Sequence, residues 1–340
     1  MIIDTHVHIT GGIQGLTGSG PTKSLTYGRA QLGDDKFQML PPFNPGPTVF
    51  EPENLLRFMD ETGVDKAVLL QGSFYGDQNE YLHRAATRWP NRLIPAAFLD
   101  PRADDARQTF HRAFDEYGFT ILKFEMSELA GFTGVYPDIR LDEEDMGWIW
   151  KECEGRNIVV TLDLGQIGTS AYQTEAVEFI LQNHPSLKIV IAHLAQPPLA
   201  NAQDADLECA WEKQILLGRH ANVWFDTAAL PAYGDDDYPF ATALKYVRRA
   251  GELIGIEKLM WGTDIPGLFG KSTYQQMLDM YRRHSGFSEV NLRQFLGETA
   301  VRVYDLPAGI RTGNCDQAKH VTASCTDQQL NEPHRGTPSA

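Results

Sequence analysis

The chain has 340 residues and a formal net charge of −15 at pH 7, with 42% hydrophobic and 22% charged residues. This balance is typical of a globular protein and disfavours nucleic-acid binding, which relies on Lys and Arg at phosphates. No uninterrupted apolar run approaches the roughly 20 residues of a membrane span, and no signal-like segment precedes the first apolar strand. We therefore expect a cytoplasmic protein that acts on a small-molecule substrate, with no membrane or nucleic-acid partner. Whether it forms a homo-oligomer is not visible in the sequence.

The first predicted strand, Ile2 to Ile9, carries an acid and two histidines at alternate positions. Alternate residues of a strand share a face, so Asp4, His6 and His8 are expected to point to the same side. Two imidazoles two residues apart can bind one metal ion. The alternative is an amphipathic edge strand whose solvent face happens to carry histidines.

Seven further apolar runs follow, separated by segments with a helical pattern such as Pro52 to Met59 and Ala103 to Tyr117. They are Lys66 to Gln71, Leu93 to Leu99, Phe119 to Glu125, Ile158 to Asp163, Leu187 to Ala192, Ala221 to Asp226 and Lys258 to Gly262. Eight strand-helix alternations predict an α/β fold, the parallel (β/α)8 TIM barrel. A doubly wound open sheet is the competing fold, but it usually has fewer strands.

Two regions fall outside the alternation, and the barrel itself is expected to span residues 1–306. Thr10 to Phe50 is rich in Gly, Pro, Ser and Thr, so we expect a long lid loop over the carboxyl ends of the strands. Pro307 to Ala340 is polar without an apolar period and is predicted to be a disordered tail.

The four cysteines show no metal-ligand spacing. Cys153 and Cys209 lie in predicted helices, whereas Cys315 and Cys325 lie in the predicted tail. We expect free thiols in a reducing compartment, with a disulfide between the two tail cysteines left open.

Polar, metal-capable side chains stand at the carboxyl ends of five predicted strands. In strand order they are His6 and His8, Lys123 and Glu125, Asp163, His193, and Asp264. The carboxyl ends of barrel strands converge on one mouth. Clustered His, Asp and Glu side chains there predict a metal site with catalytic groups around it.

Three motifs of the chain resemble those of the amidohydrolase superfamily. They are Asp4-x-His6-x-His8, Ile191-Ala192-His193-Leu194 and Gly262-Thr263-Asp264-Ile265-Pro266. More narrowly, the chain from Met1 to about Leu306 resembles the amidohydrolase-related branch, which includes aminocarboxymuconate-semialdehyde decarboxylase, resorcylate-type decarboxylases and sugar-lactone hydrolases. The resemblance implies that His6, His8 and Asp264 hold one divalent metal ion, Zn2+ or Mn2+. It implies that His193 polarises or deprotonates the metal's water.

Elementary chemistry supports these roles. A metal with an open position lowers the pKa of bound water from 15.7 to about 7 in the best zinc sites. A neutral histidine such as His193 can take or give the proton, and the second carboxylate oxygen of Asp264 can relay one to a leaving group. The alternative for His193 is a core histidine bound to a backbone carbonyl.

The chain departs from the family pattern at strand five, where relatives usually place a histidine ligand. Here the sequence reads Val160-Thr161-Leu162-Asp163-Leu164-Gly165. Asp163 can ligate the metal and shift its preference from zinc towards manganese, or it can orient a histidine from behind. A third reading is that the site has lost its metal, as in metal-free lactonase relatives.

Lys123 and Glu125 share one face of strand four. Some relatives carbamylate a lysine here to bridge two metals, so a binuclear site stays open. Alternatively Lys123 binds an anionic group of the substrate, or the two residues form a structural ion pair inside the barrel. Arg29, in the lid, is a second candidate for substrate binding, although exposure to solvent is its default.

These observations favour a metal-dependent hydrolase of a lactone or amide. The runner-up is a carboxy-lyase, a non-oxidative decarboxylase of a small aromatic or unsaturated acid, because both reactions can use the same residues. A metal-free binding protein on a barrel without catalysis is the alternative of a different class.

Overall fold

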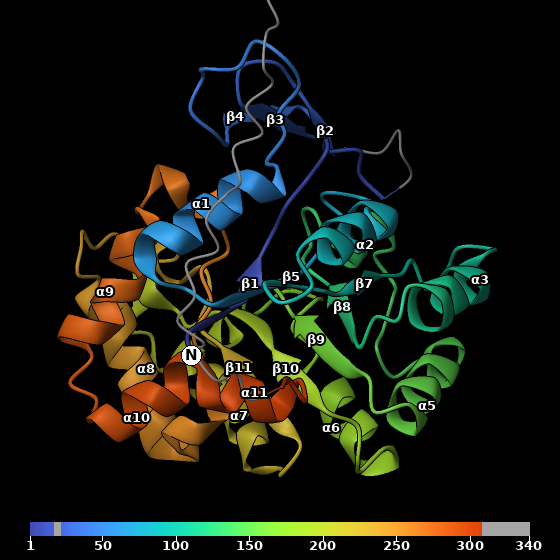
Figure 1. Ribbon diagram of the computed structural model, residues 1–340. Helices are drawn as coiled ribbons and strands as arrows, with labels where there is room; N and C mark the ends of the chain where they lie inside the picture. The colour runs from blue at the N-terminus through green and yellow to red at the C-terminus, as the bar shows by residue number, and fades with distance from the viewer. Residues whose placement is uncertain (17–21, 308–340) are drawn as a thin grey trace, which may run out of the picture. The chain divides into compact units, whose positions relative to one another are not determined.

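The computed structural model describes residues 1–16 and 22–307. Within this part of the chain, short parallel strands alternate with helices that surround them (Figure 1). The parallel strands are β1 (Ile3–Val7), β5 (Lys66–Leu69), β6 (Leu93–Pro95), β7 (Ala97–Phe98), β8 (Ile121–Glu125), β9 (Val159–Asp163), β10 (Ile189–Ile191), β11 (Val223–Asp226) and β12 (Leu259–Met260). The predicted tail from residue 308 onward, with Cys315 and Cys325, lies outside the described residues.

A helix follows each position of the barrel. The helices are α1 (Pro52–Thr62), α2 (Asn79–Arg88), α3 (Ala106–His111), α4 (Phe132–Val135), α5 (Gly147–Gly155), α6 (Thr174–Asn183), α7 (Ala205–Ile215), α8 (Ala241–Ile254), α9 (Tyr274–His284), α10 (Glu289–Arg293) and α11 (Thr299–Val303). Cys153 on α5 and Cys209 on α7 are free thiols, in helices as predicted. Among the described helices, none combines the length and apolar character needed to cross a bilayer.

The helix ends follow from local sequence. Pro52 occupies the first turn of α1, where its missing N–H costs nothing, and Gly63 ends that helix in the left-handed region at φ 74°. At the start of α9, Thr273 accepts a hydrogen bond from the backbone N–H of Gln276, whose side chain caps Thr273 in return. These short-range signals place the helices between the strands.

The strands form two parallel arcs that meet at both seams. The orders are β1-β5-β6 and β12-β11-β10-β9-β8-β7. Only Ala96 separates β6 from β7, and its N–H donates to the Leu69 carbonyl at 2.9 Å. At the other seam the Thr5 N–H donates to the Trp261 carbonyl at 3.0 Å. The predicted (β/α)8 fold is confirmed, with the third predicted strand split at Ala96.

One apolar layer fills the amino-terminal end of the barrel. Strand residues contribute Ile3, Val68, Ala96, Ile121, Val159, Val190 and Met260. Below them pack Ala300 and Val303 of α11 and the following residue, Tyr304, which close this face. Burying these aliphatic groups favours folding and leaves only the carboxyl end of the barrel for polar side chains.

The alternation predicted for β1 is wrong at Asp4. Ile3 packs in the barrel interior, and the pairing of β1 with β5 shifts register between Asp4 and Val7. Such a bulge changes which residues face inward. Asp4 therefore points outward and accepts hydrogen bonds from the Thr263 hydroxyl at 2.7 Å and from Tyr274 at 3.0 Å, while His6 points into the barrel.

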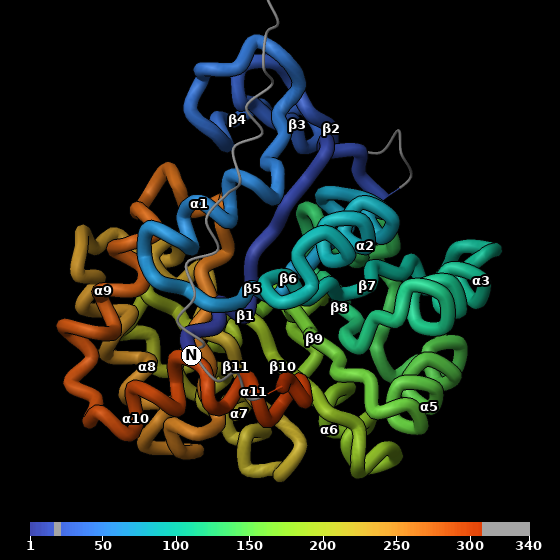
Figure 2. Tube along the Cα trace, in the orientation of Figure 1, coloured from blue at the N-terminus to red at the C-terminus, as the bar shows by residue number. Residues whose placement is uncertain are grey.

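The predicted lid loop contains a small antiparallel sheet of β2 (Thr22–Ser24), β3 (Arg29–Leu32) and β4 (Asp35–Gln38). Thr10 and Phe50 exchange two backbone hydrogen bonds of 2.9 Å, which closes the insertion at the predicted boundaries. Figure 2 follows the chain from β1 into this sheet and back to α1. The apolar side of this small sheet packs on Tyr75, which lies in the loop after β5. Whether the insertion opens and closes stays a prediction.

Candidate active site

The centre of the site is His6, which the bulge in β1 turns into the barrel. Its Nε2 atom lies 3.1 Å from Lys123 Nζ on β8 and 3.7 Å from Asp264 Oδ1 beyond β12. Burial, followed by the charge of Lys123, lowers the pKa of His6 well below its ordinary value. The imidazole is therefore neutral, which is the form that binds metals.

Asp226, at the end of β11, fixes the orientation of His6. Its Oδ2 atom lies 3.0 Å from His6 Nδ1, so a neutral His6 donates there and keeps a lone pair on Nε2. The other oxygen accepts hydrogen bonds from the backbone N–H groups of His193 and Ala228 at 2.9 and 3.1 Å. Asp226 is fully buried. The sequence predicts that a strand ends at Asp226, but no local pattern marks this residue as part of the site.

His8 approaches the same carboxylate as His6. Its Nδ1 atom lies 2.7 Å from the Leu70 carbonyl, which leaves Nε2 to contact Asp264 Oδ1 at 2.8 Å. Its ring stacks on Tyr75 with centroids 4.7 Å apart. The predicted convergence of His6, His8 and Asp264 is thus present in the structure.

His193 begins a backbone segment in which four consecutive residues take left-handed conformations. From His193 to Gln196 the φ angles are 58°, 51°, 58° and 45°. Non-glycine residues rarely adopt this region, and such strain concentrates at functional sites. The turn aims the His193 ring at the strand ends, where Nδ1 lies 3.2 Å from the Ala228 carbonyl and Nε2 lies 3.2 Å from Asp163 Oδ2.

His193 and Asp163 shift each other's pKa towards the charged forms. Burial alone would lower the pKa of His193, but Asp163 and the neighbouring carboxylates raise it to about 9. In the same way burial opposes ionisation of Asp163, and His193 holds its pKa below the ordinary value. Asp163 also accepts from the Gly165 N–H at 3.1 Å. This contact pattern matches the reading in which Asp163 orients a histidine.

Lys123 and Glu125 both lie in the barrel interior but do not pair with each other. Among the described residues no ion pair within 4.0 Å joins them, and Lys123 Nζ lies 3.1 Å from His6 Nε2 instead, although its charge still acts to lower the pKa of Glu125. Burial raises the pKa of Glu125, and its carboxylate accepts from Ser127 at 3.3 Å. The carboxylate lies over Gly72, where a methyl group would overlap Oε2. A side chain at position 72 would therefore displace the Glu125 carboxylate.

The donor set fits a metal ion. One ligand atom from each of His6, His193 and Asp264 lies within 4.8 Å of the others. Two imidazoles and a carboxylate are ligands that suit zinc or manganese. His6 Nε2 faces the Lys123 ammonium, so an ion at this atom replaces that hydrogen bond. His8 Nε2 contacts Asp264 of this group at 2.8 Å, and Asp163 contacts His193 at 3.2 Å.

Arg29 is not brought to the site. Its side chain is exposed on β3, and its Nε–H donates to the Thr26 carbonyl at 3.3 Å within the insertion. The reason is the antiparallel sheet, in which β3 pairs with β2 on one side and β4 on the other, so that the Arg29 side chain faces solvent. The default reading of Arg29, exposure to solvent, holds.

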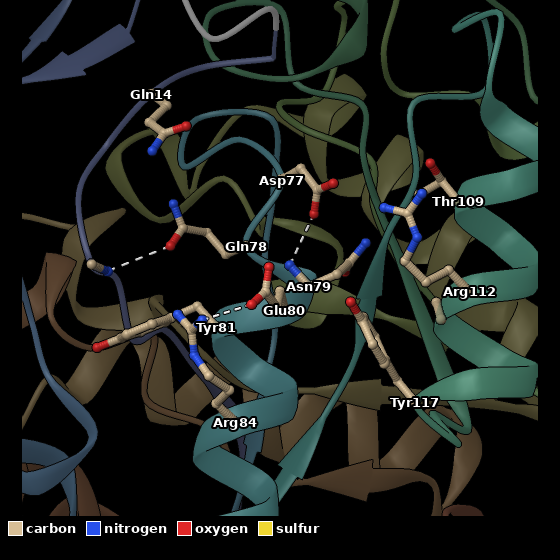
Figure 3. A pocket seen from close by; sticks show the side chains of 12 residues that line it. Gln14, Asp77, Gln78, Asn79, Glu80, Tyr81, Arg84, Thr109, Arg112 and Tyr117 are labelled. Carbon is tan, nitrogen blue, oxygen red and sulfur yellow. Dashed lines mark hydrogen bonds and ion pairs between the residues drawn. The ribbon is translucent and has the colours of Figure 1, made fainter.

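A separate pocket opens beside α2 (Figure 3). It has a volume of about 340 Å3 and is bordered by Gln14, Tyr117 and Arg112, among others. Gln78 accepts from the Gly11 N–H at 3.4 Å, and Glu80 pairs with Arg84 at 2.7 Å, as the dashed lines show. None of the predicted site residues borders this pocket.

Comparison with known proteins gives a family and several relatives. A family model described as Amidohydrolase matches residues 3–306. An L-fucono-1,5-lactonase from Burkholderia ambifaria is 23% identical over 224 residues, which cover 64% of this chain and 70% of that protein.

Solved structures share the fold at low sequence identity. A probable 2-pyrone-4,6-dicarboxylic acid hydrolase from Acinetobacter baumannii, with citric acid bound, is 17% identical. It superposes with a TM-score of 0.66 and covers 89% of this chain and 99% of its own. A 2,6-dihydroxybenzoate decarboxylase from Rhizobium is 16% identical, with a TM-score of 0.55 over 76% of this chain and 90% of its own. At these identities the structures support the fold alone.

Proposed function

The chain belongs to the amidohydrolase family, and we propose that it is a metal-dependent hydrolase of a small-molecule lactone or amide. The observation that carries the proposal is the convergence of His6, His193 and Asp264, whose ligand atoms lie within 4.8 Å of one another, with His8 in contact with Asp264 at 2.8 Å. A lactone is the first choice, because the relatives include a lactonase and a probable pyrone hydrolase.

We propose His6, His8 and Asp264 as the residues that hold the metal, with His193 beside them and Asp163 behind His193. The contacts of 2.8 and 3.7 Å from His8 and His6 to one Asp264 oxygen support this set. When bound, zinc or manganese would supply Lewis acidity to water and substrate, and its charge would favour neutral His193.

Hydrolysis of a lactone needs two proton transfers. The oxygen of water bonds to the carbonyl carbon, the ring C–O bond breaks, and the leaving oxygen takes a proton to give a hydroxy acid. In the neutral form that a bound cation would favour, with its Nδ1–H donating to the Ala228 carbonyl, His193 would accept the proton of the attacking water at Nε2. The Asp163 carboxylate, 3.2 Å from Nε2, would then stabilise the imidazolium. Asp264, whose side chain is 24% exposed, can relay that proton to the leaving oxygen.

Decarboxylation is the second candidate, and the buried Lys123 supports it. This side chain is 2% exposed and reaches the centre of the site. An ammonium there could hold a carboxylate or phenolate. In that reaction the C–C bond to the carboxylate breaks, carbon dioxide leaves, and the ring carbon takes a proton.

Isotopic labelling distinguishes the two reactions. Hydrolysis in 18O water places one heavy oxygen in the product and releases no carbon dioxide. His193→Ala should lower turnover by about 10²- to 10⁴-fold, the usual contribution of general acid-base catalysis. Release of carbon dioxide with solvent deuterium at carbon, and no oxygen incorporation, contradicts the hydrolase and supports the decarboxylase.

A further inference from the structure

A second pocket, of about 240 Å3, lies in the loops that follow β9, β10 and β11, and the side chains of Gln196 and Tyr233 separate it from the catalytic residues. Its lining includes Gln166, Gln196, Pro198, Leu199, Asn201 and Tyr233. We propose that this pocket binds the part of the substrate remote from the reacting carbonyl, and that this part is uncharged. The inference rests on the proposed function of the neighbouring site.

Two side chains connect the pocket with the catalytic residues. Gln196 lies in its wall and donates from Nε2 to Asp163 Oδ1 at 3.4 Å. Tyr233 lies in the same wall, and its ring meets the His193 ring edge to face with centroids 6.1 Å apart. Both are half-buried, whereas Gln166 and Asn201 at the other positions of the lining are exposed. The pocket therefore opens to solvent at one end and lies one side chain away from His193 and Asp163 at the other.

The lining combines apolar surface with neutral hydrogen-bonding groups. Proline and leucine side chains supply the apolar part, and three amides, from Gln166, Gln196 and Asn201, supply donors and acceptors. Such a surface suits a group with C–H faces and hydroxyls or carbonyls, such as one sugar ring or a small acyl group.

An anionic group is disfavoured in this pocket. Among the described residues, those that line it include no Lys, Arg or His. Moving a carboxylate out of water without a cationic partner is costly. Gln196 of the lining contacts the Asp163 carboxylate, whose charge would repel an anion. Lys123 is not part of the lining and lies beside His6 instead.

The volume limits the size of this group. At about 30 Å3 per water molecule, 240 Å3 holds roughly eight waters. That is the space of one ring with a few small substituents, and it excludes polymers and long acyl chains from this pocket.

Paired ligands that differ only in the charge of the remote group test the inference. We choose a hexono-1,5-lactone and the lactone whose C6 is oxidised to a carboxylate, with hexonate and hexarate as their ring-opened forms. The expected result is a kcat/KM at least about tenfold higher for the neutral lactone and a similar preference for hexonate in calorimetry.

Calorimetry also separates this inference from the proposed function. If no lactone is turned over, the hydrolase proposal fails, while binding of hexonate in preference to hexarate still supports the pocket. Equal affinity for the two acids, or binding of neither, overturns the inference whether or not lactones are hydrolysed.

A charge introduced at the rim supplies a second test. Gln166→Arg adds a cation at an exposed lining position and should improve the hexarate Kd about five- to tenfold, because a charge-assisted hydrogen bond becomes available. Gln203→Arg is the matched control, since Gln203 is exposed on a nearby loop but does not line the pocket. Equal gains in both variants would indicate a general charge effect and contradict a specific pocket.

Discussion

Replacing Asp226 with asparagine should weaken metal binding without changing any proposed ligand. The substitution preserves volume, so it leaves no cavity, but one carboxylate oxygen becomes an NH2 group. If that group faces His6 Nδ1, now 3.0 Å from the oxygen, two donors meet and His6 must place its proton on Nε2 instead. The lone pair that the metal needs is then lost.

The expected loss of metal affinity can be estimated from the hydrogen bonds that the Asp226 carboxylate makes. Losing the outer hydrogen-bond partner of a metal-binding histidine typically costs 10- to 100-fold in affinity, or about 1.4 to 2.7 kcal/mol. If the NH2 group instead faces the two backbone donors of His193 and Ala228, the cost falls on folding, at about 1 to 3 kcal/mol. We expect the loss of affinity to dominate, because two fixed N–H groups hold the other oxygen in place.

Competition titration of Mn2+ and Zn2+ against a chromogenic chelator measures the affinity, and thermal unfolding of the metal-free protein measures the folding cost. Asp4→Asn is the matched control, because Asp4 is equally buried but contacts Thr263 and Tyr274 rather than a histidine ring. Its metal affinity should stay within about threefold of wild type. Unchanged affinity in Asp226→Asn, or an equal loss in Asp4→Asn, would refute the role assigned to Asp226.

Three further outcomes are expected. Freshly purified protein should carry about one divalent ion per chain by elemental analysis, and protein that is metal-free and fully active in chelator would contradict the proposed site. Burial raises the pKa of Asp4 from 3.8 to about 7, so its contribution to stability is complete below pH 4 and is lost as the pH rises through 7. Asp4→Asn cannot ionise, so its free energy of unfolding in urea should rise relative to that of wild type by up to about 4 kcal/mol between pH 4 and 8. A difference in unfolding free energy that does not change with pH would argue against a raised pKa of Asp4. Gly72→Ala should destabilise by about 1 to 3 kcal/mol through its overlap with Glu125, and adding Glu125→Ala should recover most of that loss, with additive effects as the contrary result.

The barrel was predictable because its signals are local and repeated. Branched apolar runs mark the strands, and helix ends such as Pro52 and Gly63 follow short-range rules. The polar strand ends His6, Lys123 and Asp264 could be placed together because all parallel strands of a barrel deliver their carboxyl ends to one mouth.

What the sequence did not reveal depends on pairing between distant segments. The bulge that turns Asp4 outward is set by the register of β1 against β5, which no pattern within β1 encodes. Asp226 ends an ordinary apolar strand, and only its distance to His6 shows its role. The left-handed turn at His193 contains no glycine to announce it.

The seam between β1 and β12 also bears on biosynthesis. Asp4 is held by Thr263, and His8 contacts Asp264 across 256 positions of sequence. While the last strand is still inside the ribosome, the nascent chain therefore lacks both the hydrogen bond from Thr263 to Asp4 and the proposed metal ligand Asp264. Such long-range closure is slow and leaves intermediates exposed. With Asp264 among the ligands, as proposed, the metal site would be complete only after nearly the whole barrel has been synthesised.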